Sequence, residues 1–235
     1  MKLHVLGCHG PYPMANGATS GYLLETENDQ ILLDCGSGVL GRLIALCDPA
    51  KLSCVMLSHL HFDHMADMLV LQYYLQQAGK KLTVYVPPED DSPQKALLRP
   101  AVFDIRPYPE TLEMNGLKVT TLPVRHPVPC RALRFEEKGR VFVFTGDTNT
   151  CPGLAAFAGD ADVLMTDTAF LADEWDEKKP HLSAALGAAL AKEAGAKRLL
   201  LTHLPVRHAP ETLEAEARAV CPGAQAVFPG MTVII

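Results

Sequence analysis

Three histidines and one aspartate stand within six residues of one another, in the run SHLHFDH at positions 58–64. The run directly follows an apolar strand predicted at Ser53–Leu57. Imidazole nitrogens and carboxylate oxygens are the ligands that suit Zn, Mn or Fe. His59 and His61 are two residues apart, so an extended chain places both on one side, whereas Asp63 and His64 lie where a helix begins. This spacing favours two adjacent metal ions over one. The alternatives are a solvated polar turn, or an Asp63 that only caps the helix.

Three more polar residues follow apolar strands further along the chain, at the place where α/β folds position their sites. They are His126, Asp147 and His203, which follow the predicted strands Leu117–Leu122, Val141–Thr145 and Arg198–Thr202. A single histidine or aspartate at a strand end is more often structural. Together with the 58–64 run, these three indicate a pair of metal sites.

The elements that must position these residues alternate between strands and helices. Further strands are predicted at Leu3–Leu6, Gly21–Glu25, Gln30–Leu33, Leu82–Val86, Ala132–Glu136, Asp162–Thr166, Ala226–Phe228 and Met231–Ile234. Helical spacing or helix signals predict helices at Gly38–Cys47, Asp63–Gln77, Pro93–Leu98, Ser183–Ala194 and Pro210–Val220. No linker, low-complexity tract or short repeat interrupts the pattern. We therefore expect one α/β domain with mixed sheets over residues 1–235.

Composition and charge narrow the function classes. The 235 residues are 48% hydrophobic and 20% charged, which is ordinary for a globular protein and rules out disorder and collagen-like repeats. Lysine and arginine number 21 against 27 aspartates and glutamates, for a net charge of −6 and no basic cluster. A nucleic-acid partner therefore has no support from the bulk charge.

The cysteines and the N-terminus bear on the compartment. The chain has 7 cysteines, none in a C-x-x-C pair, and no secretory signal opens the sequence. No apolar run approaches the roughly 18 residues of a membrane span. We expect reduced, mostly buried cysteines, a cytoplasmic location and no membrane partner.

The motif set resembles the metallo-β-lactamase superfamily nearly end to end. The matching residues are the His-x-His-x-Asp-His run at 59–64, His126, Gly146-Asp147, Thr202-His203, and Asp34 within Leu32-Leu33-Asp34-Cys35-Gly36. The resemblance implies an αββα sandwich, that is, two mixed β-sheets flanked by helices. It implies one metal held by His59, His61 and His126, and a second held by Asp63, His64 and His203. Asp147 would bridge the two metals, and Asp34 would support the metal histidines from a buried position.

Finer details resemble the ribonuclease Z and cyclic-phosphate phosphodiesterase branch of that superfamily. The stretch Asp162–Phe170 is similar to the ribonuclease Z segment that ends His-Glu-Ala-Thr-Phe, with Asp167 at the glutamate position. His181-Leu182-Ser183-Ala184 resembles its His-Ser-Thr-Ala stretch, whose histidine is thought to donate a proton. The long arm that grips transfer RNA in ribonuclease Z has no counterpart between Asp147 and His203.

The resemblance implies a binuclear metal-dependent phosphodiesterase in which a hydroxide bridging the metals attacks a small cyclic phosphate or nucleotide. Zinc is the expected metal, with manganese or iron as alternatives. Asp63 would orient the attacking water, His181 would protonate the departing alkoxide, and Asp167 would hold the His181 ring. The alternatives are a ribonuclease Z-like endonuclease acting on RNA 3′ ends, and a metal-binding sensor without turnover.

Several residues have open roles at this stage. His4 is predicted to be structural. A homodimer is an open alternative, and substrate contact is open for His9, Asn16, Thr19, Ser20, His208 and Trp175.

Overall fold

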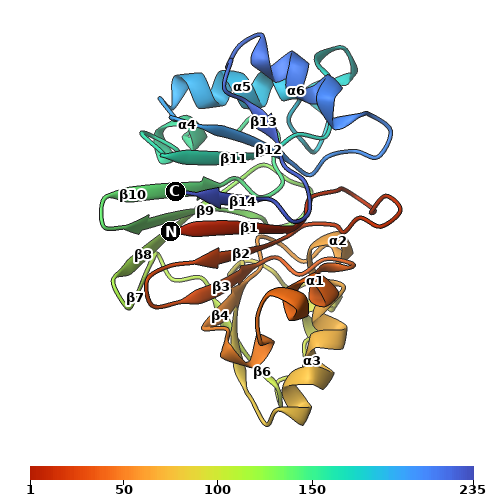
Figure 1. The fold of residues 1–235 in the computed structure, drawn as a ribbon, viewed down its shortest axis with the longest axis vertical. Helices are drawn as coiled ribbons and strands as arrows, with labels where there is room; N and C mark the ends of the chain where they lie inside the picture. Colours follow the sequence, from red (N-terminus) through yellow and green to blue (C-terminus); the bar gives the residue numbers. More distant parts are fainter. The chain divides into compact units, whose positions relative to one another are not determined.

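The computed structural model describes residues 1–235, which form two compact units. The first unit comprises Met1–Pro109 and Phe228–Ile234, and the second comprises Glu110–Val227 and Ile235. Each unit contains one seven-stranded sheet and its own helices (Figure 1). The predicted fold class, α/β with two mixed β-sheets flanked by helices, is confirmed. One domain over residues 1–235 stays a prediction.

The sheet of the first unit has the strand order β14-β1-β2-β3-β4-β5-β6. Its strands are β1 (Lys2–Gly7), β2 (Gly21–Glu25), β3 (Gln30–Leu33), β4 (Cys54–Met56), β5 (Leu82–Val86), β6 (Phe103–Pro107) and β14 (Thr232–Ile234). Pairing is antiparallel from β14 to β3 and parallel from β3 to β6. The parallel strands β3 and β4 therefore end at the same edge, where Asp34 and the 58–64 run follow.

The helices of the first unit are α1 (Val39–Leu46), α2 (Phe62–Met65) and α3 (Met68–Gln77), with short 3₁₀ turns at Pro49–Lys51 and Pro93–Leu97. Strand residues such as Leu32 and Val55 share one buried apolar cluster with Leu43 of α1 and Leu71 of α3. Alternate strand side chains point to one face of a sheet, so this cluster joins the helices to that face. It supplies the rigid base from which the 58–64 run projects.

The helix expected at Asp63–Gln77 is divided into α2 and α3. The amide of Cys35 donates to the carbonyl of His64 (2.7 Å), and the amide of Asp67 donates to the carbonyl of Cys35 (3.0 Å). Both backbone groups would otherwise take part in the continuous i to i−4 ladder of one helix. The break therefore ties the His64 turn to the segment that carries Asp34.

The sheet of the second unit has the order β13-β12-β11-β10-β9-β8-β7. Its strands are β7 (Thr111–Met114), β8 (Leu117–Pro123), β9 (Arg131–Glu137), β10 (Arg140–Phe144), β11 (Val163–Asp167), β12 (Leu199–Thr202) and β13 (Gln225–Ala226). Pairing is antiparallel from β7 to β10 and parallel from β10 to β13. Strands β9 and β10 form a hairpin. Its two-residue turn has φ of 50° at Lys138 and 74° at Gly139, as tight hairpins require.

The helices of the second unit are α4 (Leu154–Phe157), α5 (Ala184–Glu193) and α6 (Pro210–Arg218). The Ser183 side chain accepts a hydrogen bond from the amide of Leu186, so the N-terminus of α5 is capped two residues after His181. In Figure 1 these helices are blue-green to blue, next to β11, β12 and β13.

Some features depart from the sequence predictions. Strands β6 and β7, helix α4 and a 3₁₀ turn at Ala172–Glu174 were not predicted. All cysteines are free thiols, and Cys8, Cys35, Cys54 and Cys130 are buried as expected, whereas the other three are half-exposed. No helix combines the length and the apolar character needed to cross a bilayer.

Candidate metal centre

Four of the predicted metal ligands lie in the first unit, just beyond the end of β4. The Nε2 atom of His59 is 3.0 Å from Nδ1 of His61, and the His59 and His64 ring centroids are 4.1 Å apart. Asp63 Oδ2 lies 3.6 Å from Nε2 of His64. The structure thus brings together the four candidate ligands of the 58–64 run, whose spacing favoured two adjacent metal ions. His59 and His64 are fully buried, and His61 and Asp63 are half-buried.

Asp34 supports this cluster through the hydrogen bonds of its buried carboxylate. Its backbone has a φ of 54°, in the left-handed region, and its carboxylate is fully buried. One carboxylate oxygen accepts the Ser58 amide at 2.7 Å. The other accepts the Ser58 hydroxyl at 2.9 Å, the Ser20 hydroxyl at 3.2 Å and Nδ1 of His64 at 2.7 Å. The role that the family resemblance implied for Asp34 agrees with these contacts.

The hydrogen bond from His64 to Asp34 bears on metal binding. An ionised carboxylate only accepts hydrogen bonds, so Nδ1 of His64 carries the hydrogen and Nε2 carries the lone pair of the neutral ring. A carboxylate behind a histidine is the usual support of a metal-binding imidazole, because it fixes the tautomer and the ring orientation. Ser58 connects Asp34 to a second histidine, since its hydroxyl also lies 3.1 Å from Nδ1 of His59. The first unit therefore fits a divalent metal by the chemistry of its donors.

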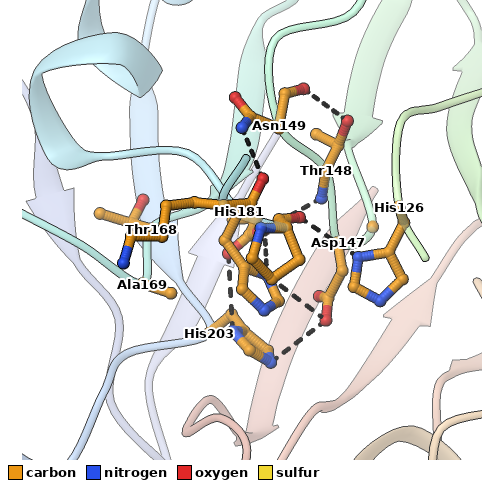
Figure 2. A network of polar contacts seen from close by, with 12 residues as sticks. His126, Asp147, Thr148, Asn149, Thr168, Ala169, His181 and His203 are labelled. Carbon is orange, nitrogen blue, oxygen red and sulfur yellow. Dashed lines mark hydrogen bonds and ion pairs between the residues drawn. The ribbon is translucent and has the colours of Figure 1, made fainter. Parts of the chain in front are cut away.

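The second unit brings together His126, Asp147, His181 and His203 (Figure 2). His203 Nε2 lies 3.2 Å from Oδ2 of Asp147, and His181 Nδ1 lies 3.8 Å from the same oxygen. The rings of His181 and His203 stack with centroids 4.6 Å apart, and those of His126 and His181 are 5.3 Å apart. His203 has a φ of 54°, a strained value for a residue other than glycine.

Asp167 lies at the end of β11 and is fully buried. Its Oδ2 accepts Nδ1 of His181 at 2.7 Å and the amide of Thr148 at 2.9 Å. Burial raises the pKa of Asp167, and the neighbouring His181 opposes that rise. Ligand atoms of Asp147, Asp167, His181 and His203 all lie within 4.8 Å of one another, a density of nitrogen and oxygen donors that suits a metal ion.

His126 is oriented by the segment that precedes His181. Its Nδ1 lies 3.2 Å from the carbonyl oxygen of Pro180 and donates to it, which leaves Nε2 with the lone pair. The same arrangement orients His64 in the first unit. A backbone carbonyl is one of the usual partners of a metal-binding histidine.

Several contributors were not recognised from the sequence. Ser58 connects Asp34 to His59, the Thr148 amide binds Asp167, and Trp175 Nε1 donates to the carbonyl oxygen of His181 at 3.1 Å. Ser58 and Thr148 adjoin His59 and Asp147 in the sequence, and that adjacency was the only available signal. Their hydrogen bonds join residues far apart in the chain.

The remaining histidines have partners of their own. His4 contacts Glu25 at 2.9 Å and Thr232 at 3.0 Å, which agrees with its predicted structural role. His9 is buried, and its Nδ1 lies 3.2 Å from the carbonyl oxygen of Ala18. His208 lies 2.8 Å from Glu174.

Three residues of the N-terminal loop, for which substrate contact was left open, are buried or have partners within the protein. Ser20 binds Asp34, Thr19 is buried, and the carbonyl oxygen of Asn16 accepts from Arg42.

Comparison with known proteins identifies the family. A profile described as "Beta-lactamase superfamily domain" matches residues 29–204. The relative named "Probable metallo-hydrolase YhfI", from Bacillus subtilis (strain 168), is 36% identical over 231 residues, which is 95% of each chain. The chain belongs to the metallo-β-lactamase superfamily. The crystal structure described as the metallo-β-lactamase fold protein YhfI from Bacillus subtilis matches with a TM-score of 0.93 and 33% identity, covering 99% of this chain and 98% of that one.

A ribonuclease Z from Methanosarcina acetivorans is a more distant relative of the present chain. The two are 27% identical over 270 residues, and the match covers 88% of each chain. Membership confirms the predicted superfamily and the predicted class of metal-binding hydrolase. The family implies divalent metal ions, and the His/Asp clusters of both units have the donors to hold them.

Proposed function

We propose that this metallo-hydrolase is a phosphodiesterase that acts on a small cyclic phosphate or nucleotide. The residues proposed to hold one divalent ion are His59, His61 and His126, and those for the second are Asp63, His64 and His203, with Asp147 shared. Zinc is the proposed metal because histidine and carboxylate sets are typical of catalytic zinc, and manganese or iron also accept such ligands.

The hydrogen bond between His181 and Asp167 is the observation that carries the proposal. It lies in the second unit, beside the Asp147–His203 pair, and joins a partly exposed imidazole to a fully buried carboxylate. Such a carboxylate stabilises the protonated ring, which can then donate its other hydrogen. A proton donor is needed when an alkoxide must leave, as in the hydrolysis of an alkyl phosphodiester.

Each side chain then has a defined task. When bound, divalent ions supply positive charge that polarises the phosphoryl group and lowers the pKa of water. Asp63 accepts a hydrogen bond from the attacking water and orients it toward phosphorus. His181 delivers the Nε2 proton to the leaving oxygen, while Asp167 keeps Nδ1 protonated. Asp34 and Ser58 hold the imidazoles of His64 and His59 in one orientation.

Ribonuclease activity on RNA 3′ ends is the second candidate. The similarity to the ribonuclease Z of Methanosarcina acetivorans favours it, because a ribonuclease also cleaves phosphodiesters. The net charge of −6 argues against it, since a polyanion is usually held by many lysine and arginine contacts. We therefore rank the small cyclic substrate first.

One screen separates the two candidates. The purified protein, loaded with Zn²⁺ or Mn²⁺, is assayed on cyclic nucleotides, cyclic ribose phosphates and a precursor transfer RNA at several salt concentrations. We expect hydrolysis of a small diester whose rate changes only about two- to three-fold between 50 and 200 mM salt, because few phosphate contacts compete with counterions. Efficient cleavage of the RNA, with no activity on any small diester, would reverse the ranking.

Two accompanying proposals concern the cellular location and the oligomeric state of the protein. The free cysteines are consistent with a cytoplasmic location, which cell fractionation checks. A homodimer stays a proposal, and sedimentation of the purified protein tests it.

A further inference from the structure

The segment that carries His181 is a closed loop of the second unit, residues 170–183. Phe170 and Ser183 form a β-bridge at its base, the amide of Ala184 donates to the carbonyl oxygen of Phe170 (2.9 Å), and the amide of Ala169 donates to that of Leu182 (3.2 Å). Backbone bonds at the base fix where the loop begins and ends. The two ends of the loop are therefore joined, and His181 lies two residues before Ser183.

Side chains from outside the loop also hold it. Asn149, two residues after Asp147, donates from Nδ2 to the carbonyl oxygen of Lys179 at 2.6 Å. Arg125, the residue before His126, donates from Nη2 to the carbonyl oxygen of Glu177 at 2.7 Å. The backbone of Lys179 is thus anchored by the segment that contains a proposed metal ligand.

Phe170 lies near His181 and contacts two cations. Its ring centroid is 6.1 Å from that of His181. The ammonium nitrogen of Lys179 lies 5.4 Å from the centre of the Phe170 ring, and the guanidinium carbon of Arg207 lies 5.1 Å from it. The ring therefore holds both cations through cation–π contact close to the proposed proton donor.

The two cations differ in whether a carboxylate group balances their positive charge. Arg207 donates to the carbonyl oxygen of Ala169 at 2.8 Å and forms an ion pair with Glu174 at 3.1 Å. Glu174 also contacts His208, so this carboxylate belongs to an internal network. Lys179 makes no ion pair, and its ammonium group lies over the Phe170 ring. Lys179 is half-buried and lies two residues before His181, and no carboxylate balances its charge.

We propose that Lys179 determines specificity by binding a second phosphate group on the leaving-group side of the substrate. This inference rests on the proposed function, because it places the leaving oxygen at His181. The group attached to that oxygen then extends toward Phe170 and Lys179. A hydrogen bond from an ammonium to a phosphate oxygen is stronger than a cation–π contact, so the flexible lysine exchanges the ring for the phosphate.

The proposal agrees with the low total charge of the chain. A single cation recognises one extra phosphate, whereas a long nucleic acid needs many such contacts. The expected substrate is therefore a small cyclic diester that carries one further phosphate. That phosphate could be a terminal monoester or the next diester in a short chain, and the experiment below distinguishes them.

The test compares three substrates that share one reacting group. They are adenosine 2′,3′-cyclic phosphate, the same compound with a 5′-phosphate, and a dinucleotide that ends in the cyclic phosphate. In wild type, kcat/KM should be about 10-fold or more higher for the substrate whose extra phosphate reaches Lys179. Lys179→Ala should lower that preference about 10- to 100-fold, the scale of one hydrogen bond to a charged group. Lys179→Arg should restore much of it. Lys178→Ala, at the exposed neighbouring lysine, is the matched control and should keep the preference.

A second readout does not depend on turnover. Trp175 is the only tryptophan of the chain and lies in the same loop, bonded to the carbonyl oxygen of His181. Adenosine 5′-monophosphate, which is not a diester, is titrated into the purified protein while Trp175 fluorescence is followed. Lys179→Ala should raise the Kd about 10-fold or more, and Lys178→Ala should leave it unchanged.

The outcomes separate the inference from the proposed function. If wild type hydrolyses the cyclic diesters without preference, or Lys179→Ala lowers kcat/KM equally for all three, Lys179 is not a specificity residue. If wild type hydrolyses none of them, the broader screen described above decides the proposed function, and the titration alone decides the role of Lys179. Equal Kd values for wild type and Lys179→Ala would then overturn it.

Discussion

The Nδ1 atom of His181 lies 2.7 Å from Oδ2 of Asp167, and this hydrogen bond determines which nitrogen can face a substrate. Asp167 is fully buried, so its carboxylate is costly to leave without hydrogen-bond donors. The bond supplies one such donor to Oδ2 and fixes the imidazole with Nε2 pointing away from Asp167. This orientation is the one that the proposed proton-donor role of His181 requires.

Replacing His181 should affect substrates according to their leaving groups. An alkoxide cannot depart unprotonated, whereas a nitrophenolate leaves readily without help. His181→Ala should slow an alkyl or nucleoside diester by roughly 10²–10⁴-fold, the usual scale of acid–base assistance. It should slow bis(p-nitrophenyl) phosphate much less. Rates on both substrates and the metal content by elemental analysis check this.

Two results would remove His181 from the proton-donor role. Equal losses of rate on both substrates would indicate that His181 positions the substrate or stabilises the fold. A fall in bound metal would mean that His181 takes part in holding the ions, because its Nδ1 also lies 3.8 Å from Asp147.

Replacing Asp147 should remove metal as well as activity. Its proposed role is to serve both ions with one carboxylate, and wild type should hold about two ions per chain. Asp147→Ala should lower occupancy at both sites and abolish hydrolysis. Asp173→Ala, at an exposed aspartate of the same unit, is the control and should keep both. Full metal content with near-normal activity in Asp147→Ala would refute the shared role.

The sequence was most informative where function depends on neighbouring positions. The 58–64 run predicted the cluster of the first unit because its spacing alone places His59 near His61. In the structure a nitrogen of His59 lies 3.0 Å from a nitrogen of His61. Asp147 and His203 were recognised because each follows an apolar strand. Parallel strands end at a common edge, so residues after β10 and β12 meet.

What the sequence did not predict depends on contacts between distant positions. The break between α2 and α3 comes from backbone bonds to Cys35, some 30 residues earlier, and the local pattern of Asp63–Gln77 shows only a helix. Strand β7 lies at the edge of its sheet and has only 4 residues, so its alternation of polar and apolar side chains is too short to identify a strand. The cation pair over Phe170 joins residues from two separate loops.

The stability of the Glu174 network should depend on pH with a defined sign. A hydrogen bond from Arg207, with a second contact from His208, lowers the pKa of Glu174 to about 2. Because the unfolded value is about 4.3, this ionised group stabilises the fold above that pH, and the contribution is lost as pH falls toward about 2.

Comparison with a neutral variant measures that contribution. The Glu174 side chain is 31% exposed, so solvent screening limits the effect to about 1 kcal/mol or less at pH 7. Glu174→Gln should lower Tm by about 1–4 °C at pH 7, and the difference from wild type should shrink between pH 4.5 and pH 2. A difference that stays constant over this range would show that the charge of Glu174 does not matter.

Gly36 should tolerate no side chain, because it lies against the turn that carries two proposed metal ligands. A Cβ at Gly36 would overlap the carbonyl oxygen of Asp63 and Oγ1 of Thr19. The Asp63 carbonyl belongs to the backbone, so the whole turn must shift to make room. Gly36→Ala should therefore destabilise the protein by about 1–3 kcal/mol and weaken metal binding together, because the displaced turn carries Asp63 and His64.

Gly41 provides the matched control for this prediction. It is exposed within α1, and a Cβ there would meet no atom within 4 Å. Alanine favours helix by about 0.5–1 kcal/mol over glycine, so Gly41→Ala should raise Tm and leave metal affinity unchanged. Thermal melts and metal titrations of both variants decide the matter. Wild-type Tm and metal affinity in Gly36→Ala would show that the turn can move without cost, and that the close approach of Gly36 to Asp63 does not position the ligands.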